Sequence, residues 1–105
     1  MNFCYIYLTC DAKEADELAQ TLLNRHLVVC VKKTVVDAQY WWQKDLEKAT
    51  ETLLIMESAE EKFGDIEALL GKIHSYDTFV LTAVPMVKVS KDAKQWFNKY
   101  LEEKI

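Results

Sequence analysis

The stretch LVVCVKKTVVDAQYWW, residues 27–42, decides the fold, because it is rich in β-branched and aromatic residues and holds no glycine or proline. It predicts one long strand with a bend. A polar connection, residues 44–48, leads to a second β-favouring run from Thr52 to Met56. The connection is too short for a crossover, so the two strands should pair in an antiparallel hairpin. Its length predicts a loose turn rather than a two-residue turn.

Helical patterns lie before the hairpin and at the end of the chain. Asp11 followed by Glu14 resembles a capping box, and apolar residues then recur at helical spacing, which predicts a helix near residues 12–26. Ser90 is a candidate N-cap for a last helix near residues 91–103, whose apolar stripe carries Trp and Phe.

A further amphipathic helix follows the hairpin. Ser58 and Glu61 match a capping box and predict a helix near residues 59–74. Its end places His74 where the helix dipole favours the charged form of the imidazole ring.

Two more strands complete the pattern. Residues 2–9 do not alternate cleanly and predict a first strand covered on both faces, and residues 78–87 predict a fourth strand. Pro85 lacks an N–H group, so we expect this strand at a sheet edge or with a bulge. The order βαββαβ, then α, predicts an α+β, ferredoxin-like fold with an antiparallel sheet.

Length and charge limit the function. The 105 residues, half of them apolar, predict one domain over residues 1–105. A net charge of −4 disfavours nucleic acid as a partner. We expect no membrane association, because no apolar segment approaches ~20 residues, and a cytoplasmic location, because no signal-peptide pattern is present.

The three cysteines do not form a recognisable site. Cys4 and Cys10 on one strand would stand ~20 Å apart, too far for a disulfide. With Cys30 they match neither CxxC nor zinc-ligand spacing, which favours buried, reduced thiols. The single cysteine of the first βα loop also disfavours a metallochaperone of this fold.

Several residues together resemble the CutA family over nearly the whole chain. They are Val29-Cys30-Val31, Tyr40-Trp41-Trp42, Glu51, His74, Tyr76 and Trp96. The resemblance implies a PII-like homotrimer, implicated in tolerance of divalent metal ions, notably copper, that is not an enzyme. It also implies a ligand-binding cleft between subunits, formed by Cys30, Tyr40, Trp42, Glu57, His74 and Tyr76.

The strand pattern gives independent support to self-association. Adjacent strand residues face opposite ways, so Trp41 and Trp42 cannot both enter one subunit's core, whereas Tyr40 and Trp42 share a face. One indole then needs a partner surface, and a projecting hairpin leaves unpaired edges that a closed assembly would cover.

The chemistry of the cleft leaves alternatives open. Cys30 and His74 are the candidate metal ligands, and we expect copper or another divalent cation to bind weakly, if at all. At Glu57 the family usually has a lysine, so the charge of the cleft is reversed there. The aromatic residues could form interface core or a small-ligand pocket. The second reading makes the protein a PII-like small-ligand sensor.

Overall fold

The computed structural model describes residues 1–102, and the end of the predicted last helix, residue 103, lies outside them. The elements are β1 (Phe3–Cys10), α1 (Ala12–Asn24), β2 (Cys30–Trp42), β3 (Asp45–Ala59), a 3-10 turn (Glu60–Lys62), α2 (Phe63–Ile73), β4 (Leu81–Pro85) and α3 (Lys91–Leu101). The strands form one sheet in the order β2-β3-β1-β4, and each paired neighbour is antiparallel. The α+β, ferredoxin-like prediction is confirmed.

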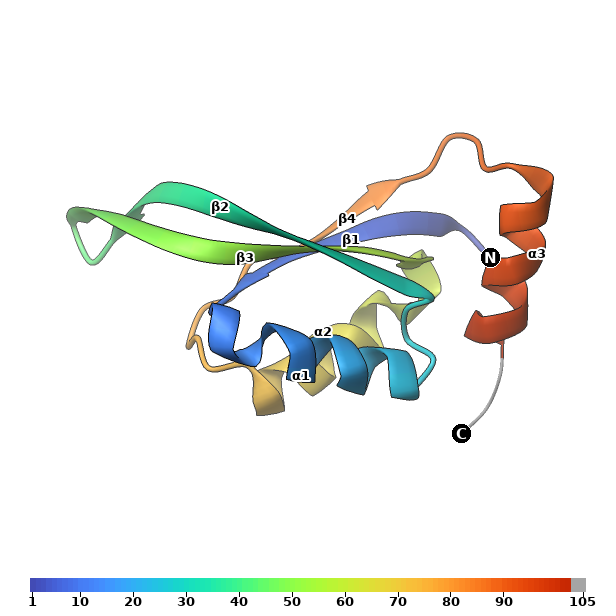
Figure 1. Ribbon diagram of the computed structural model, residues 1–105, viewed down its shortest axis with the longest axis horizontal. Coiled ribbons are helices and arrows are strands. Elements are labelled where there is room, and N and C mark those ends of the chain that lie inside the picture. Colours follow the sequence, from blue (N-terminus) through green and yellow to red (C-terminus); the bar gives the residue numbers. More distant parts are fainter. Residues whose placement is uncertain (103–105) are drawn as a thin grey trace.

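One face of the sheet carries the main core. Alternate residues of β1, from Cys4 to Cys10, are buried with Leu54 and Met56 of β3 against α1 and α2. Both helices lie below the sheet in Figure 1. The prediction that β1 is covered on both faces is wrong, because Tyr5 and Tyr7 on the other face remain exposed.

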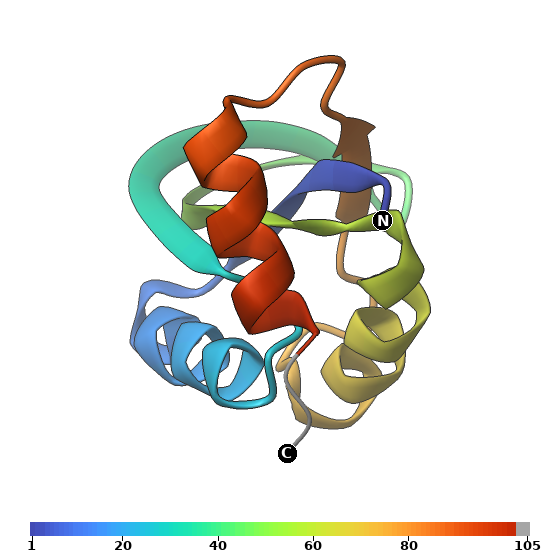
Figure 2. The ribbon, with the colours of Figure 1, turned by 90° about the vertical axis from the view of Figure 1, so that its right-hand side faces the viewer.

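The far end of the sheet is covered by α3. Phe97 and Leu101 are buried with Ala59, and the Phe97 ring meets the Phe3 ring edge-on at 5.3 Å between centroids. Figure 2 shows α3 crossing this end of the sheet. Of the apolar stripe predicted for the last helix, Phe97 and Leu101 are buried, whereas Trp96 and Tyr100 remain exposed.

The central hairpin projects beyond the rest of the sheet (Figure 1). β3 pairs with β1 only over Thr52–Ala59, whereas its first half pairs with β2 alone. The turn is tight, because Trp42 pairs with Asp45 and only Gln43 and Lys44 lie between them, at φ values of 49° and 73°. The predicted loose turn is therefore wrong. Two positive φ values are typical of a type I′ turn, whose twist matches that of the strands.

The predicted capping signals have mixed outcomes. The Asp11 carboxylate accepts a hydrogen bond from the Lys13 N–H at 2.9 Å and so caps α1. Ser90 occupies the N-cap position of α3 without a side-chain hydrogen bond.

The capping box predicted for α2 is wrong. The buried Ser58 hydroxyl donates to the Leu27 carbonyl at 2.6 Å instead of capping a helix. The Glu61 carboxylate accepts from the Asn2 N–H. Tertiary partners have replaced local ones at both residues.

The strands differ from their predicted bounds: β3 is longer than the predicted run from Thr52 to Met56 and begins at Asp45, within the connection predicted for residues 44–48. β2 begins at Cys30, later than the predicted start at residue 27, and β4 covers only Leu81–Pro85. Pro85 ends this edge strand, as expected from its missing N–H group. None of the helices described over residues 1–102 has the length and apolar composition that a membrane crossing requires.

Candidate functional site: an aromatic hollow under the hairpin

A hollow of ≈ 510 Å³ separates the projecting hairpin from the loop after α2. Tyr40 and Trp42 share one face of β2, because strand side chains alternate. Tyr76 comes from the loop that follows α2. The lining residues are Thr9, Ala38, Tyr40, Trp41, Trp42, Glu51, Tyr76, Asp77, Thr78 and Val80. The fold therefore brings three of the predicted site residues, Tyr40, Trp42 and Tyr76, to one place.

The Tyr76 hydroxyl donates a hydrogen bond to the Glu51 Oε1 atom at 3.0 Å. Burial raises the pKa of Tyr76 well above its usual range, and the neighbouring Glu51 carboxylate raises it further. The phenol is thus a neutral donor at ordinary pH. It orients a carboxylate at the wall of the hollow while leaving it room to accept other hydrogen bonds.

His74 lies behind Tyr76 and orients it. The imidazole is fully buried, its Nε2–H donates to the Thr9 carbonyl at 3.0 Å, and its Nδ1 accepts from the Tyr76 N–H at 3.0 Å. The rings of His74 and Tyr76 are 4.7 Å apart between centroids. This pattern requires a neutral ring with its proton on Nε2, so the predicted charged form is wrong in this arrangement.

Glu14 lies on the other side of this loop. Its carboxylate accepts hydrogen bonds from the N–H and hydroxyl groups of Ser75, and one oxygen lies 3.8 Å from the Nδ1 atom of His74. The residue expected to complete the cap of α1 therefore anchors the loop that carries Tyr76. The sequence pattern predicted a local partner for Glu14 because Asp11 lies three residues away, and only the fold reveals the distant partner, Ser75.

Cys30 and Glu57 form a separate cluster at the base of the hairpin. They are paired across β2 and β3, and Lys32 makes an ion pair with Glu57 and lies 3.5 Å from the Cys30 sulfur. The hydrogen bond to Glu57 raises the pKa of Lys32. Lys32 therefore supplies a cation beside Glu57, a role that the sequence alone did not reveal.

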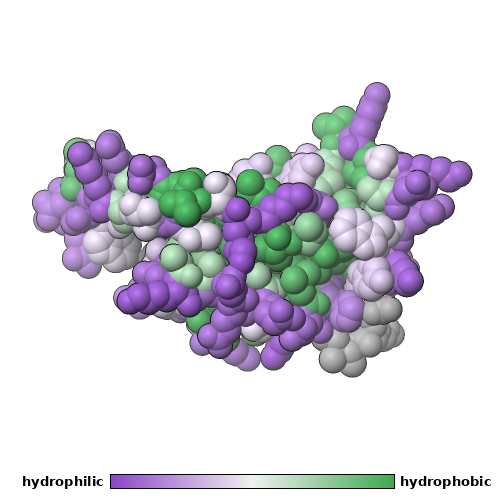
Figure 3. Space-filling model, in the orientation of Figure 1, coloured by the Kyte–Doolittle hydropathy of each residue, from purple (hydrophilic) through white to green (hydrophobic). Residues whose placement is uncertain are grey.

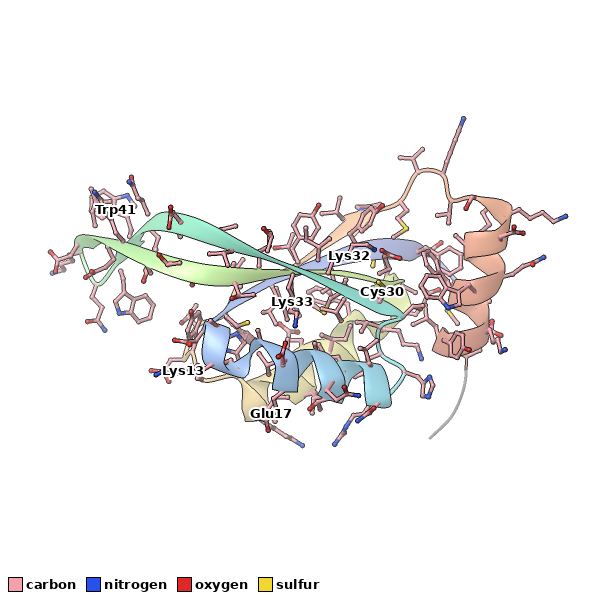
Figure 4. The ribbon with its side chains drawn as sticks, viewed as in Figure 1. Lys13, Glu17, Cys30, Lys32, Lys33 and Trp41 are labelled. Carbon is pink, nitrogen blue, oxygen red and sulfur yellow. The ribbon has the colours of Figure 1, made fainter. Side chains whose placement is uncertain are left out.

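The two clusters are well separated within one chain. Cys30 pairs with Glu57 of β3, which in turn pairs with Tyr5 of β1. His74 instead binds the carbonyl of Thr9, which lies four residues further along β1 than Tyr5. At about 3.3 Å per residue this is ~13 Å along the strand alone. Figure 4 shows Cys30 and Lys32 at the base of the hairpin and Trp41 at its far end. Over residues 1–102, no three His, Cys, Asp or Glu side chains are placed to hold a metal ion together.

These features define a class: a ferredoxin-like α+β protein with a projecting central hairpin, an added C-terminal helix and an aromatic hollow beneath the hairpin. Within this class, residues 4–100 match the model of the CutA1 divalent ion tolerance protein family. The chain belongs to that family, as its sequence pattern predicted.

Known proteins agree with this assignment. The divalent-cation tolerance protein CutA of Archaeoglobus fulgidus is 30% identical over 99 residues, which are 93% of this chain and 97% of that one. That of Thermotoga maritima is 25% identical over 83% of this chain and 86% of the relative.

Solved structures extend the agreement to three dimensions. The A. fulgidus structure, described as a periplasmic divalent cation tolerance protein CutA, matches with a TM-score of 0.92 over 95% of this chain and 99% of that one. CutA1 from Oryza sativa also has a TM-score of 0.92, at 21% identity, over 99% and 97% of the two chains. The rice protein shows the fold alone at this identity.

Proposed function

We propose that this protein acts as a homotrimeric, non-catalytic binding protein in the tolerance of divalent metal ions, copper among them. The observation that carries the proposal is the open aromatic hollow beneath the projecting hairpin, in a chain of the CutA1 divalent ion tolerance family. A second subunit would close this hollow, so assembly and ligand binding are parts of one function.

The uncovered face of the sheet supports self-association. Tyr5, Tyr7 and Val84 are each more than a third exposed there, and Trp41 on the hairpin is 71% exposed. Figure 3 shows hydrophobic side chains over the hairpin and the middle of the molecule, set among hydrophilic ones. Apolar surface of this kind is typical of protein interfaces, and a closed symmetric assembly would cover it together with the free edge of β2.

The state of the ionisable residues supports binding rather than catalysis. His74, a natural general base, is fully buried, and both of its ring nitrogens are engaged in hydrogen bonds. Burial raises the pKa of both Cys4 and Cys10 to about 11, which makes them poor nucleophiles. One oxygen of Glu51 accepts a hydrogen bond from the phenol of Tyr76. His74 and Glu51 thus hold Tyr76 in place at the hollow.

Copper would bind weakly, because Cys30 and His74 lie in different clusters and a tight site needs several convergent ligands. A stronger site would require ligands from two subunits. Calorimetry with copper and zinc on reduced protein tests the expected weakness of metal binding. A site of sub-micromolar Kd with one ion per subunit, lost in Cys30→Ser, would contradict that expectation.

The second candidate function is a PII-like sensor of a small organic ligand. The size of the hollow, ≈ 510 Å³, favours it, because small-molecule pockets are typically ~300–1,000 Å³ and lined by aromatic groups. A thermal-shift screen with metals and nucleotides separates the two candidates. A ligand that binds the folded state raises Tm in a concentration-dependent way.

We also propose a cytoplasmic location, where the three free thiols would stay reduced. The A. fulgidus structure is described as periplasmic, so the two compartments need a direct comparison. Fractionation of cells into cytoplasm and periplasm provides it, and recovery of the protein with periplasmic markers would overturn this part of the proposal.

A further inference from the structure

The charge of the hollow distinguishes it from a general apolar pocket. Its charged lining residues are Glu51 and Asp77, and no Lys, Arg or His is among the described residues that line it. The hollow therefore combines aromatic rings with negative charge. It lacks the basic groups that a phosphate or carboxylate ligand would require.

The hairpin adds further carboxylates on the same face. Tyr40 and Trp42 are paired across the strands with Glu47 and Asp45, and paired residues share a face. Lys48 is paired with Gln39, which faces the opposite way. The register thus places acids beside the aromatic rings and turns this lysine of the hairpin away from them.

The aromatic groups are held open rather than packed into the core. Tyr40 and Trp42 are each about 40% exposed, at 41% and 43%. Tyr76 is held from behind by His74, and its hydroxyl fixes the Glu51 carboxylate. Rings that are fixed in place and faced by a carboxylate attract cations through their negative faces.

We propose that this hollow binds the head of an organic cation, such as a methylated ammonium group, between the rings of Tyr40, Trp42 and Tyr76, with Glu51 as its counter-ion. The proposal rests on the proposed role of the hollow as a ligand-binding cleft and names the class of ligand. An inorganic divalent ion fits this arrangement less well, because it needs several convergent oxygen or nitrogen ligands and gains little from apolar rings.

Titration of the 15N-labelled full chain with tetramethylammonium chloride, followed by NMR, tests the proposal. The three indole N–H resonances act as separate reporters, because Trp41 and Trp42 line the hollow whereas Trp96 lies on α3. We expect the Trp42 resonance to move saturably and that of Trp96 to stay in place. Sodium chloride at equal ionic strength and tert-butanol, a neutral molecule of similar size, should produce no saturable shift.

Charge variants make the test specific. Glu51→Gln retains an oxygen that can accept the Tyr76 hydroxyl but removes the charge, and should weaken binding by about tenfold. Glu67→Gln, a matched change at an exposed position of α2, should leave the affinity unchanged.

Three outcomes would overturn the inference: no saturable shift at Trp42, an equal shift with tert-butanol, or an affinity that Glu51→Gln leaves unchanged. Light scattering on the same samples measures assembly independently. A trimer without binding overturns this inference and leaves the proposed assembly standing, whereas binding to a monomer supports the inference and overturns the assembly.

Discussion

His74 connects the sheet to the loop that forms the hollow. Its hydrogen bonds to Thr9 and Tyr76 are both made inside the protein, where an unpaired partner is costly. The sequence indicated a histidine at a helix end and therefore a charged ring. It could not indicate that the chain would return to bury this ring and use both of its nitrogens.

Removal of the His74 side chain should destabilise the protein. His74→Ala leaves the Thr9 carbonyl and the Tyr76 N–H without partners, so we expect the free energy of unfolding to fall by about 2–3 kcal/mol. Urea denaturation measures this loss. Lys72→Ala, at an exposed position of the same helix, is the control and should change it by less than ~0.5 kcal/mol. Equal effects of the two variants would contradict the structural role of His74.

The thiols of Cys4 and Cys10 should make stability fall in alkaline solution. Burial raises the pKa of each from 9.0 to about 11, and nearby carboxylates add to this shift. Because the folded state holds these protons more tightly, the stabilisation is complete below pH ~9 and is lost as pH rises through ~11. Denaturation midpoints from pH 8 to 11 test this. The fall should be smaller in Cys10→Ala, and an equal fall would contradict the assignment.

At the scale of elements, the central hairpin supplies half of the residues that line the hollow. Its strand composition predicted two long β segments, but the sequence around Gln43 and Lys44 contains no Asn-Gly or similar turn signal. The tight turn is instead imposed by the register of the strands that pair on either side. A local pattern cannot reveal a turn that distant pairing selects.

The hairpin turn should therefore tolerate, and gain from, residues that favour positive φ. Gln43→Asn with Lys44→Gly should raise the free energy of unfolding by about 1 kcal/mol, because non-glycine residues in the left-handed region are strained by ~1–2 kcal/mol. Thermal unfolding measures the gain. Lys48→Gly, inside β3, should instead lower stability, since glycine disfavours a strand. A loss in the turn variant would contradict the turn assignment.

The candidate site was predictable only in part. Tyr40 and Trp42 share a face by strand alternation, and the family pattern added Tyr76, so their proximity follows from sequence. Cys30 and Glu57 also belong to the predicted cleft, but the register places them at the other end of the hairpin with Lys32. The distance between this pair and the hollow depends on the register of the strands, and residue types alone do not determine that register.

At the scale of the whole molecule, one chain leaves the site open. Trp41 and Trp42 face opposite ways on a ribbon that projects beyond the sheet, and both indoles are exposed. The exposed face of the sheet adds further apolar surface. The proposed trimer explains why a small acidic protein displays so many aromatic groups.

Truncation of a hairpin indole should weaken this assembly. Trp42→Ala removes an aromatic side chain that we expect at the interface, and such truncations typically cost about 2–4 kcal/mol. Sedimentation over a range of protein concentrations would show this weakening, because the variant should dissociate at higher concentrations than the unaltered protein. Lys91→Ala, at an exposed position at the start of α3, is a control expected to leave dissociation unchanged. Unchanged dissociation in Trp42→Ala would place the interface elsewhere.

If the protein is the proposed trimer, light scattering coupled to gel filtration of the purified, reduced protein at micromolar concentration should give a mass three times that of the 12.2 kDa chain. A mass near 12.2 kDa under these conditions would contradict it.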